Sequence, residues 1–218
     1  MTRMRMLLFG AAVVASMTAT GCAAKGPVKF QAIQVSGEKV AMPEGTRVNP
    51  AEWPNACRLL TKDEIKSMLP QAGVSSESKR VKFIGPGAPK SEAPAGQCVY
   101  LLSLPGTTTS YRSMIWVDIV AIGDTRPLAT VADFSSTATV TDHGNSLGPQ
   151  QCVTTRSPSS SQPNLYCRQG PLTFALSGSP LKKASIEGAS TEAERDEIWY
   201  QKAVIPTAKA VAAKVSGP

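Results

Sequence analysis

The sequence predicts an α+β domain in which an antiparallel sheet is packed by a short N-terminal helix and a long C-terminal helix. Two S/T-x-x-E capping boxes, Thr61-x-x-Glu64 and Thr191-x-x-Glu194, mark where these helices begin. Between them, short runs rich in β-branched and aromatic residues alternate with turn-forming residues, as in an antiparallel sheet. Four cysteines spread over the same region indicate two disulfides.

The chain begins with the layout of a secretory signal. Two arginines precede an apolar run over residues 6–17, and small residues follow. The stretch Ala19-Thr20-Gly21-Cys22 is similar to a bacterial lipobox. We therefore expect residues 1–21 to be a lipoprotein signal peptide and Cys22 to carry acyl chains such as palmitate, which would anchor the mature protein in a membrane. An uncleaved transmembrane anchor and an ordinary secreted protein remain as alternatives.

After the signal we expect a tether, followed by one domain. Residues 22–50 contain Gly, Pro and scattered charge, so this segment is predicted to be mostly irregular, with one short strand at 28–35. Residues 51–218 form the single extracytoplasmic domain. Its first helix follows Thr61 and ends at Pro70, because proline cannot continue a helix.

The middle of the domain reads as strands separated by turns. Residues 85–96 are rich in Pro and Gly and predict a loop, and residues 157–164 predict another. A short helix is expected within residues 127–134. The expected strands cover residues 97–104, 113–122, 137–142, 151–156, 165–167 and 172–177.

The last expected element is a long helix from Thr191 to Val215. Valine and alanine residues recur on one face, at positions 204, 208, 211 and 215, which is typical of a helix packed on a sheet. Pro206 lies inside this pattern and predicts a kink. No internal repeat is present.

The chain holds five cysteines, and five is an odd number. If Cys22 carries lipid, an even set remains in an exported chain, as a disulfide framework requires. Four cysteines allow three pairings, and nearness in sequence favours Cys57 with Cys98 and Cys152 with Cys167. None of the gaps has the short spacing of a zinc site, so we expect no metal.

The charge of the chain is consistent with an envelope protein but does not specify a partner. Removing residues 1–21 lowers the formal net charge from +7 to +5. The basic clusters at 79–82 and 182–183 lack interleaved aromatic residues, so we expect no nucleic-acid partner. The membrane, contacted through the N-terminal lipid, is the expected partner, together with an envelope protein or a small apolar ligand.

One stretch resembles a catalytic motif. Gly144-Asn-Ser146-Leu-Gly148 matches G-x-S-x-G, and the only histidine, His143, precedes it. A nucleophile elbow needs a helix directly after the serine, whereas Gly148-Pro149 and another apparent strand follow here. We interpret this stretch as a turn between strands, and keep a serine hydrolase using Ser146 and His143 as the alternative.

Other candidate sites are weaker. Ser179-x-x-Lys182 matches a serine–lysine dyad, but Pro180 disrupts the helix that would orient the pair. Asp118 is the only acid in a strongly apolar strand, where alternation places it on the same face as Trp116 and Val120. We expect a solvent-facing position, with a buried hydrogen-bonded acid or a ligand pocket as alternatives. No cofactor-binding motif is present.

Several of these features together resemble a family of small actinobacterial envelope lipoproteins, known as domain of unknown function 3558. The resemblance rests on Cys57-Arg-Leu-Leu-Thr-Lys-Asp-Glu, Gly96-Gln-Cys98-Val-Tyr, Gln151-Cys152-Val and an Ala-rich C-terminal helix, and covers residues 55–215. Family members often carry the last cysteine in the terminal helix, whereas Cys167 lies in a predicted strand. The resemblance implies an extracytoplasmic α+β domain on the outer face of the cell membrane.

With no catalytic residue set, the sequence favours a non-enzymatic module of the cell envelope that binds a ligand or a protein. A structural or assembly role in the envelope is the second alternative, beside the hydrolase. The sequence identifies no ligand-binding residue.

Overall fold

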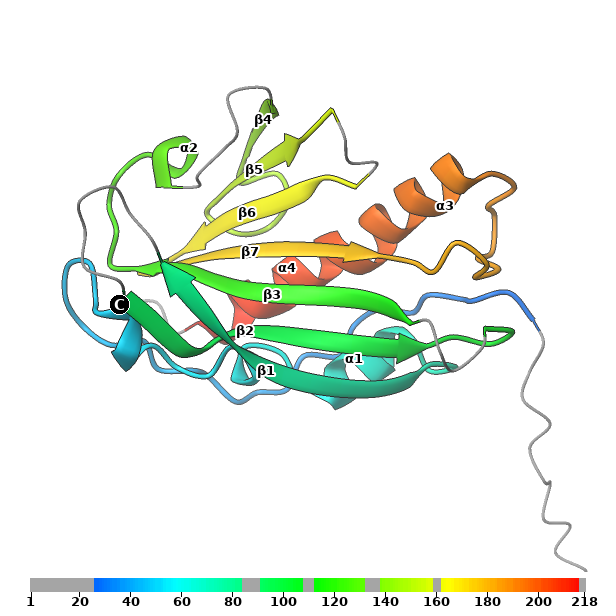
Figure 1. Cartoon of the computed structure of the whole chain (residues 1–218), viewed down its shortest axis with the longest axis horizontal. Helices are drawn as coiled ribbons and strands as arrows, with labels where there is room; N and C mark the ends of the chain where they lie inside the picture. The colour runs from blue at the N-terminus through cyan, green and yellow to red at the C-terminus, as the bar shows by residue number, and fades with distance from the viewer. Residues whose placement is uncertain (1–25, 84–90, 108–111, 132–137, 159–161, 216–218) are drawn as a thin grey trace, which may run out of the picture.

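Seven strands form one antiparallel sheet in the order β1-β2-β3-β7-β6-β5-β4 in the computed structural model (Figure 1). The structure describes residues 26–83, 91–107, 112–131, 138–158 and 162–215. The strands are β1 (Gly73–Phe83), β2 (Ser91–Ser103), β3 (Ser113–Ile122), β4 (Thr139–Gly144), β5 (Gln151–Arg156), β6 (Asn164–Gln169) and β7 (Leu172–Ser179). This arrangement confirms the predicted α+β class with an antiparallel sheet.

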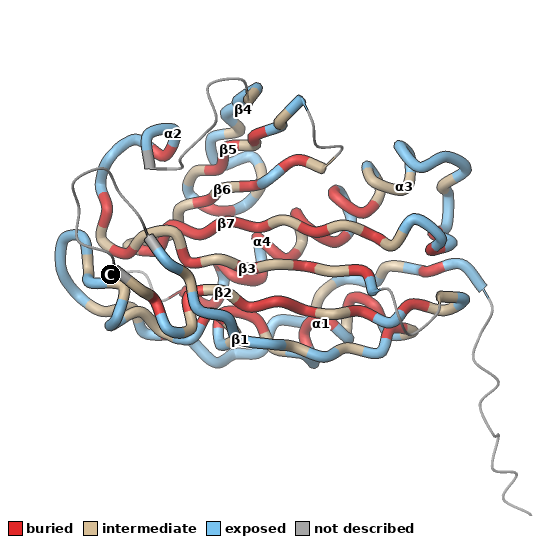
Figure 2. The backbone as a smooth tube through the Cα atoms, in the orientation of Figure 1, coloured by how far each residue is buried: buried red, intermediate tan, exposed pale blue. Residues whose placement is uncertain are grey.

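The helices over residues 62–68 and 192–214 lie against one face of the sheet (Figure 1). Along β3, Ile115, Val117 and Ile119 are buried in the core beneath the helices, while alternate residues are partly exposed on the opposite face (Figure 2). We call this opposite face the outer face. The alternation follows from the two-residue period of a strand.

Both capping boxes begin helices, as predicted. The helices are α1 (Lys62–Met68), α2 (Leu128–Val131), α3 (Glu192–Trp199) and α4 (Ile205–Lys214), with 3-10 turns at Pro50–Glu52 and Ala56–Arg58. In α1, the Glu64 N–H donates to Thr61 Oγ1 (3.2 Å) and the Thr61 N–H donates to Glu64 Oε2 (2.6 Å). Thr191 and Glu194 repeat this pattern at α3. The segment α2 lies within the short helix expected at 127–134, of which residues 132–134 are outside the described residues.

The C-terminal helix passes through a π-helical turn, η3 (Tyr200–Val204), between α3 and α4. The Ile205 N–H donates to the carbonyl of Tyr200, five residues earlier. Pro206 follows directly, and its ring would collide with the carbonyl four residues before it in a regular α-helix. The wider turn accommodates the proline that the sequence analysis identified as the irregular point of this helix.

Residues 26–49 form no helix or strand, yet they pack along the domain. Val28 and Val40 are fully buried. The Val28 N–H donates to Ser185 (2.7 Å), and the Val40 N–H donates to Lys214 (2.8 Å). The strand expected at 28–35 is reduced to a bridge between Val28 and Ile186. The packed part of the chain therefore begins before residue 51, where the sequence analysis placed the start of the domain.

The first strands differ from the prediction in two respects. β1 was not predicted, and β2 begins at Ser91, inside the expected loop 85–96, of which residues 85–90 lie outside the described residues. Most side chains of β1 are polar and exposed, because it is an edge strand. Charged edge strands resist pairing with other chains, but they carry almost none of the hydrophobic pattern by which strands are recognised.

Both favoured disulfides are present. Cys57 bonds to Cys98 and so attaches the turn before α1 to β2. Cys152 and Cys167 bond directly across the β5–β6 ladder, where they are register partners. Each cross-link restricts the unfolded chain, by about 3 to 4 kcal/mol in the loop-entropy account.

A buried ion pair joins three distant parts of the chain. Lys214 Nζ lies 3.1 and 3.2 Å from the two carboxylate oxygens of Glu64, and the two side chains are only 1% and 3% exposed. Glu64 Oε1 also accepts the N–H and the hydroxyl of Ser36, each at 2.8 Å. Burial by itself would raise the pKa of Glu64, but donors from Thr61, Ser36 and Lys214 together lower it.

Replacing Lys214 by Met is expected to lower the free energy of unfolding by about 3 kcal/mol or more, because Glu64 loses its buried counter-charge. The double variant Glu64→Gln/Lys214→Met should recover part of this loss. Urea denaturation measures both, with Lys202→Met on the exposed surface of η3 as the control. If K214M is as stable as this control, the pair does not hold the fold.

The pH dependence of stability should change when Glu64 is replaced. A carboxyl whose pKa is lower in the folded state than its ordinary 4.5 stabilises the fold above that value, and the contribution is lost as the pH falls through the folded pKa. Between about pH 5 and about pH 3, the wild type should therefore lose more stability than Glu64→Gln. Glu77→Gln, on exposed β1, should behave like the wild type; parallel loss in all three proteins would contradict the assignment.

Candidate functional site

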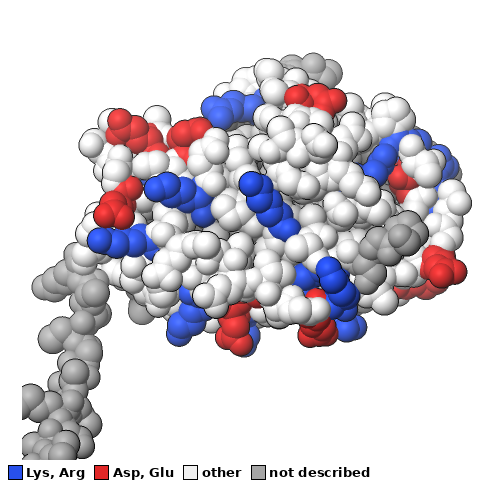
Figure 3. Space-filling model, turned by 180° about the vertical axis from the view of Figure 1, so that it is seen from behind, with Lys and Arg blue, Asp and Glu red and all other residues white. Residues whose placement is uncertain are grey.

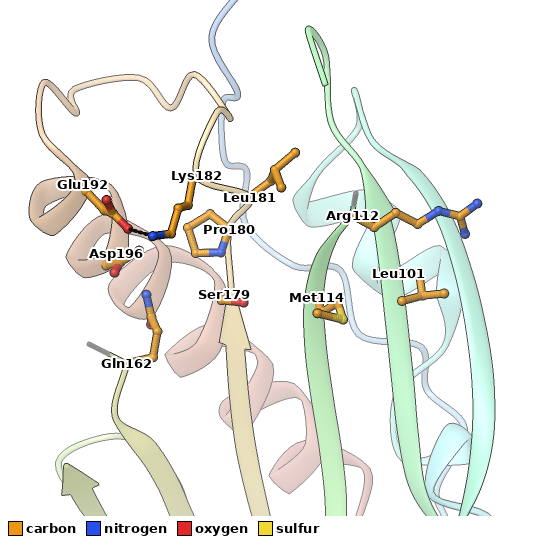
Figure 4. A pocket seen from close by; sticks show the side chains of 10 residues that line it. All are labelled: Leu101, Arg112, Met114, Gln162, Ser179, Pro180, Leu181, Lys182, Glu192 and Asp196. Atoms are coloured by element: carbon orange, nitrogen blue, oxygen red, sulfur yellow. Dashed lines mark ion pairs between the residues drawn. The ribbon is translucent and has the colours of Figure 1, made fainter. Parts of the chain in front are cut away.

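A groove of about 530 Å³ lies where β2 and β7 end and β3 begins, beside α3 (Figure 4). We call it the α3 groove. Its walls come from three strands on one side and from α3 and the residues before β6 on the other. The described lining residues are Leu101, Arg112, Met114, Gln162, Ser179, Pro180, Leu181, Lys182, Glu192 and Asp196.

One wall of the α3 groove is an extension of the outer face of the sheet. Leu101 pairs with Met114 across β2 and β3, and Met114 pairs with Ser179 across β3 and β7. These residues therefore form one cross-strand row on the outer face. Pro180 and Leu181 continue the apolar lining after β7 ends.

The rim of the groove carries charges of both signs. Lys182 Nζ lies 3.4 Å from Glu192 Oε1, with 82% and 55% of the two side chains exposed. An ion pair this exposed contributes about 1 kcal/mol or less, so a bound molecule can replace it at small cost. Arg112 donates to Ser75 Oγ at 3.3 Å on the far side, and Asp196 adds a carboxylate from α3.

Two further hollows follow the same flank of α3. The second, of about 180 Å³, shares Asp196 with the α3 groove, and the third, of about 300 Å³, shares Arg156, Pro163 and Glu197 with the second. The hollows therefore succeed one another along the helix. The first two turns of α3 are largely exposed, which leaves this flank open.

The third hollow is lined mainly by polar residues. His143, Arg156, Glu197 and Tyr200 line it together with the hydroxyls of Thr139, Thr141 and Thr154. His143 Nε2 is in hydrogen-bond contact with Thr154 Oγ1. Burial raises the pKa of Tyr200, and the Thr154 hydroxyl partly opposes this shift. This group of side chains offers hydrogen-bond donors and acceptors to a polar ligand.

Ser146 lies in the turn between β4 and β5, as the sequence analysis interpreted it. Its hydroxyl donates to the main-chain carbonyl of His143 at 2.7 Å, and its N–H donates to the same oxygen at 3.1 Å. The His143 imidazole instead contacts Thr154 on β5. The serine and the imidazole thus have different partners, and the turn leads into a strand rather than a helix.

Asp118 lies on the same face as Trp116, as alternation predicted, but it is half-buried and hydrogen-bonded and not in the solvent-facing position that we expected. It pairs across the ladder with Gln97 and Ala175. Burial raises the pKa of its carboxyl, and a hydrogen bond from Gln97 partly lowers it. Among the described residues, Oδ1 is buried without a hydrogen-bond partner. The carboxyl lies neither fully in solvent nor among the residues that line the α3 groove.

The remaining predicted site residues are divided between the described and undescribed parts of the chain. Cys22, the expected lipid attachment site, is outside the described residues. Within the described part, no group of three or more His, Cys, Asp or Glu residues is placed to hold a metal ion. No helix in that part is both long enough and apolar enough to cross a membrane.

The α3 groove was not predicted from the sequence. Ser179 and Lys182 were noted only for their match to a serine–lysine dyad, and the structure places the ammonium of Lys182 beside Glu192. The lining residues come from separate segments with no shared local motif. Only the register of β2, β3 and β7 could have indicated that Leu101, Met114 and Ser179 are neighbours.

The comparisons with known proteins add no assignment to this geometry. No family model, no curated protein and no solved structure matches the chain.

Proposed function

We propose that this protein is an exported lipoprotein, held by acyl chains on Cys22 at the extracytoplasmic face of the cell membrane, and that it binds an amphiphilic small molecule in the α3 groove without catalysing a reaction. The α3 groove is the main observation that supports a binding function. Its volume of about 530 Å³ is in the range of small-molecule sites. Its apolar floor and charged rim suit a ligand with an apolar part and a polar head.

The cysteines support the proposed compartment. Cys57, Cys98, Cys152 and Cys167 are all paired, and structural disulfides persist mainly outside the cytoplasm. Cys22 is then the single cysteine without a disulfide role, at the position where a lipobox-like sequence would direct acylation. The resemblance to envelope lipoproteins points to the same location.

The arrangement around Ser146 supports a binding role over a hydrolytic one. A nucleophilic serine needs a base within hydrogen-bond reach and donors for the oxyanion. Here the hydroxyl is engaged by the main chain of its own turn. The polar hollow around His143 is therefore better suited to extend the binding surface along α3.

A charge placed in the floor of the groove should weaken ligand binding. Met114→Lys is expected to reduce the affinity for a fluorescent fatty acid by at least about tenfold, because an apolar chain would then lie against an ammonium group. Val120→Lys is the matched control, since Val120 is partly exposed on the outer face of the same strand but does not line the groove. Fluorescence titration measures both. Equal affinity of M114K and the wild type would exclude the groove as the site.

The proposed anchor is tested by the intact mass of protein extracted from native membranes. We expect a chain that lacks residues 1–21 and is heavier by the acyl groups on Cys22. Cys22→Ser should abolish this modification. In detergent phase partitioning, this variant should move from the detergent phase to the aqueous phase, because it has no acyl chain. A native protein that retains residues 1–21, or that has free thiols at the other four cysteines, would refute the lipoprotein assignment.

A further inference from the structure

The N-terminal segment connects the proposed anchor to the domain over a very short distance. Val28 is buried and bonded to the domain on both sides of Ile186, through the carbonyl of Ser185 (2.7 Å) and the N–H of Glu187 (3.1 Å). Only six residue steps separate Cys22 from Val28. A fully extended chain spans about 3.6 Å per residue, so Cys22 lies within about 22 Å of Val28.

The chain stays attached to the domain after Val28, so residues 28–48 do not lengthen the flexible tether. The Gln31 N–H donates to Met68 (2.9 Å), Phe30 packs edge-on against Trp199, and Val40 is buried beside Lys214. The segment then reaches the opposite end of the sheet, where the Val48 N–H donates to Ile122 (3.0 Å). Residues 26–48 thus run along the domain from one end to the other (Figure 1).

The length of the domain exceeds the reach of the anchor. β2 has 13 residues, which at about 3.3 Å per residue corresponds to roughly 43 Å along the sheet. The end near Gly45, which contacts Gly123, is therefore about two anchor lengths away from Val28. A chain attached at Cys22 brings the Val28 end, and not the Gly45 end, next to the lipid surface.

From this geometry we infer that the domain contacts the membrane through the end that carries Val28, Ile186 and the loop after β7. The partner of this surface is the headgroup layer of the bilayer. The inference rests on the proposed acylation of Cys22. Three exposed lysines lie at this end, Lys29, Lys182 and Lys183. Lys29 and Lys182 form ion pairs with the exposed carboxylates of Glu187 and Glu192. Because exposed ion pairs are weak, lipid phosphates can replace these carboxylates as partners of the two lysines.

The face of the domain that carries the helices shows, among its described residues, no broad charged area that could bind the headgroups instead (Figure 3). There, basic and acidic side chains are interspersed over the described residues, without a broad area of one sign (Figure 3). The position of the anchor therefore decides the orientation. Leu181 and Lys182, which line the α3 groove, precede Ile186 by five and four residues, so the groove lies at the membrane end.

Depth-dependent quenching tests the orientation in the full acylated chain. A fluorophore is attached to Lys183→Cys at the membrane end or to Glu44→Cys at the opposite end, both exposed positions. The proteins are reconstituted into phospholipid vesicles that carry a nitroxide on the headgroup. We expect several-fold stronger quenching at 183 than at 44; equal or reversed quenching would overturn the inference.

A second variant tests whether the short connection between Cys22 and Val28 sets the orientation. Ten Gly/Ser residues inserted between Ala24 and Lys25 should bring the two quenching values close together, and unchanged contrast would show that the connection does not set the orientation. Intact mass of the same preparations separates the two proposals. A chain without acyl groups refutes the lipoprotein assignment, whereas an acylated chain without the quenching contrast refutes only the orientation.

Discussion

The buried carboxylate of Glu64 is the constraint on which the arrangement of this domain depends. It accepts hydrogen bonds from α1, from the N-terminal segment at Ser36 and from Lys214 at the end of α4. A charge withdrawn from water without partners destabilises a fold by several kcal/mol, so these three segments are stable only together. The hydroxyl of Tyr100 on β2 donates to the Leu60 carbonyl nearby, and this bond connects the same junction to the sheet. Glu64 thereby joins the N-terminal segment and the end of α4 to α1, and the nearby Leu60 connects this junction to the sheet.

The groove beside α3 follows from how the C-terminal helix is held. Most residues of α4 are buried, and Trp199 packs close to Gly178 on β7, where an added Cβ would come within 3.2 Å of the indole nitrogen. Before Trp199, α3 is largely exposed, and the helix leaves a hollow beside the ends of β2 and β7. The π-helical turn that accommodates Pro206 lies between the buried and the exposed halves. Irregular turns of this kind are frequent at functional sites, and here the turn adjoins the polar hollow that contains Tyr200.

The covalent features and the packed N-terminal segment both bear on the proposed location in the cell envelope. Two disulfides cross-link the sheet and its connection to α1, as the proposed location outside the cytoplasm would favour. Residues 26–49 pack on the domain instead of separating it from the proposed anchor. A binding groove at the anchored end would lie close enough to the bilayer to exchange an amphiphile with it. On a long flexible tether, the groove would instead spend most of its time away from the bilayer.

Local chemistry accounts for the features that could be predicted from the sequence. The capping boxes at Thr61 and Thr191, the core strands with period-two hydrophobicity and the turn at Ser146 could be predicted, because each depends on residues close in sequence. The even set of cysteines predicted two disulfides but allowed three pairings, and nearness in sequence favoured the pairing that the structure has. Tertiary structure alone decided the rest. β1 is a strand because β2 offers it an edge, and its polar residues give no hydrophobic signal of their own. Val28 and Val40 are buried because distant segments cover them, and the α3 groove exists only because strand register brings together residues far apart in the chain.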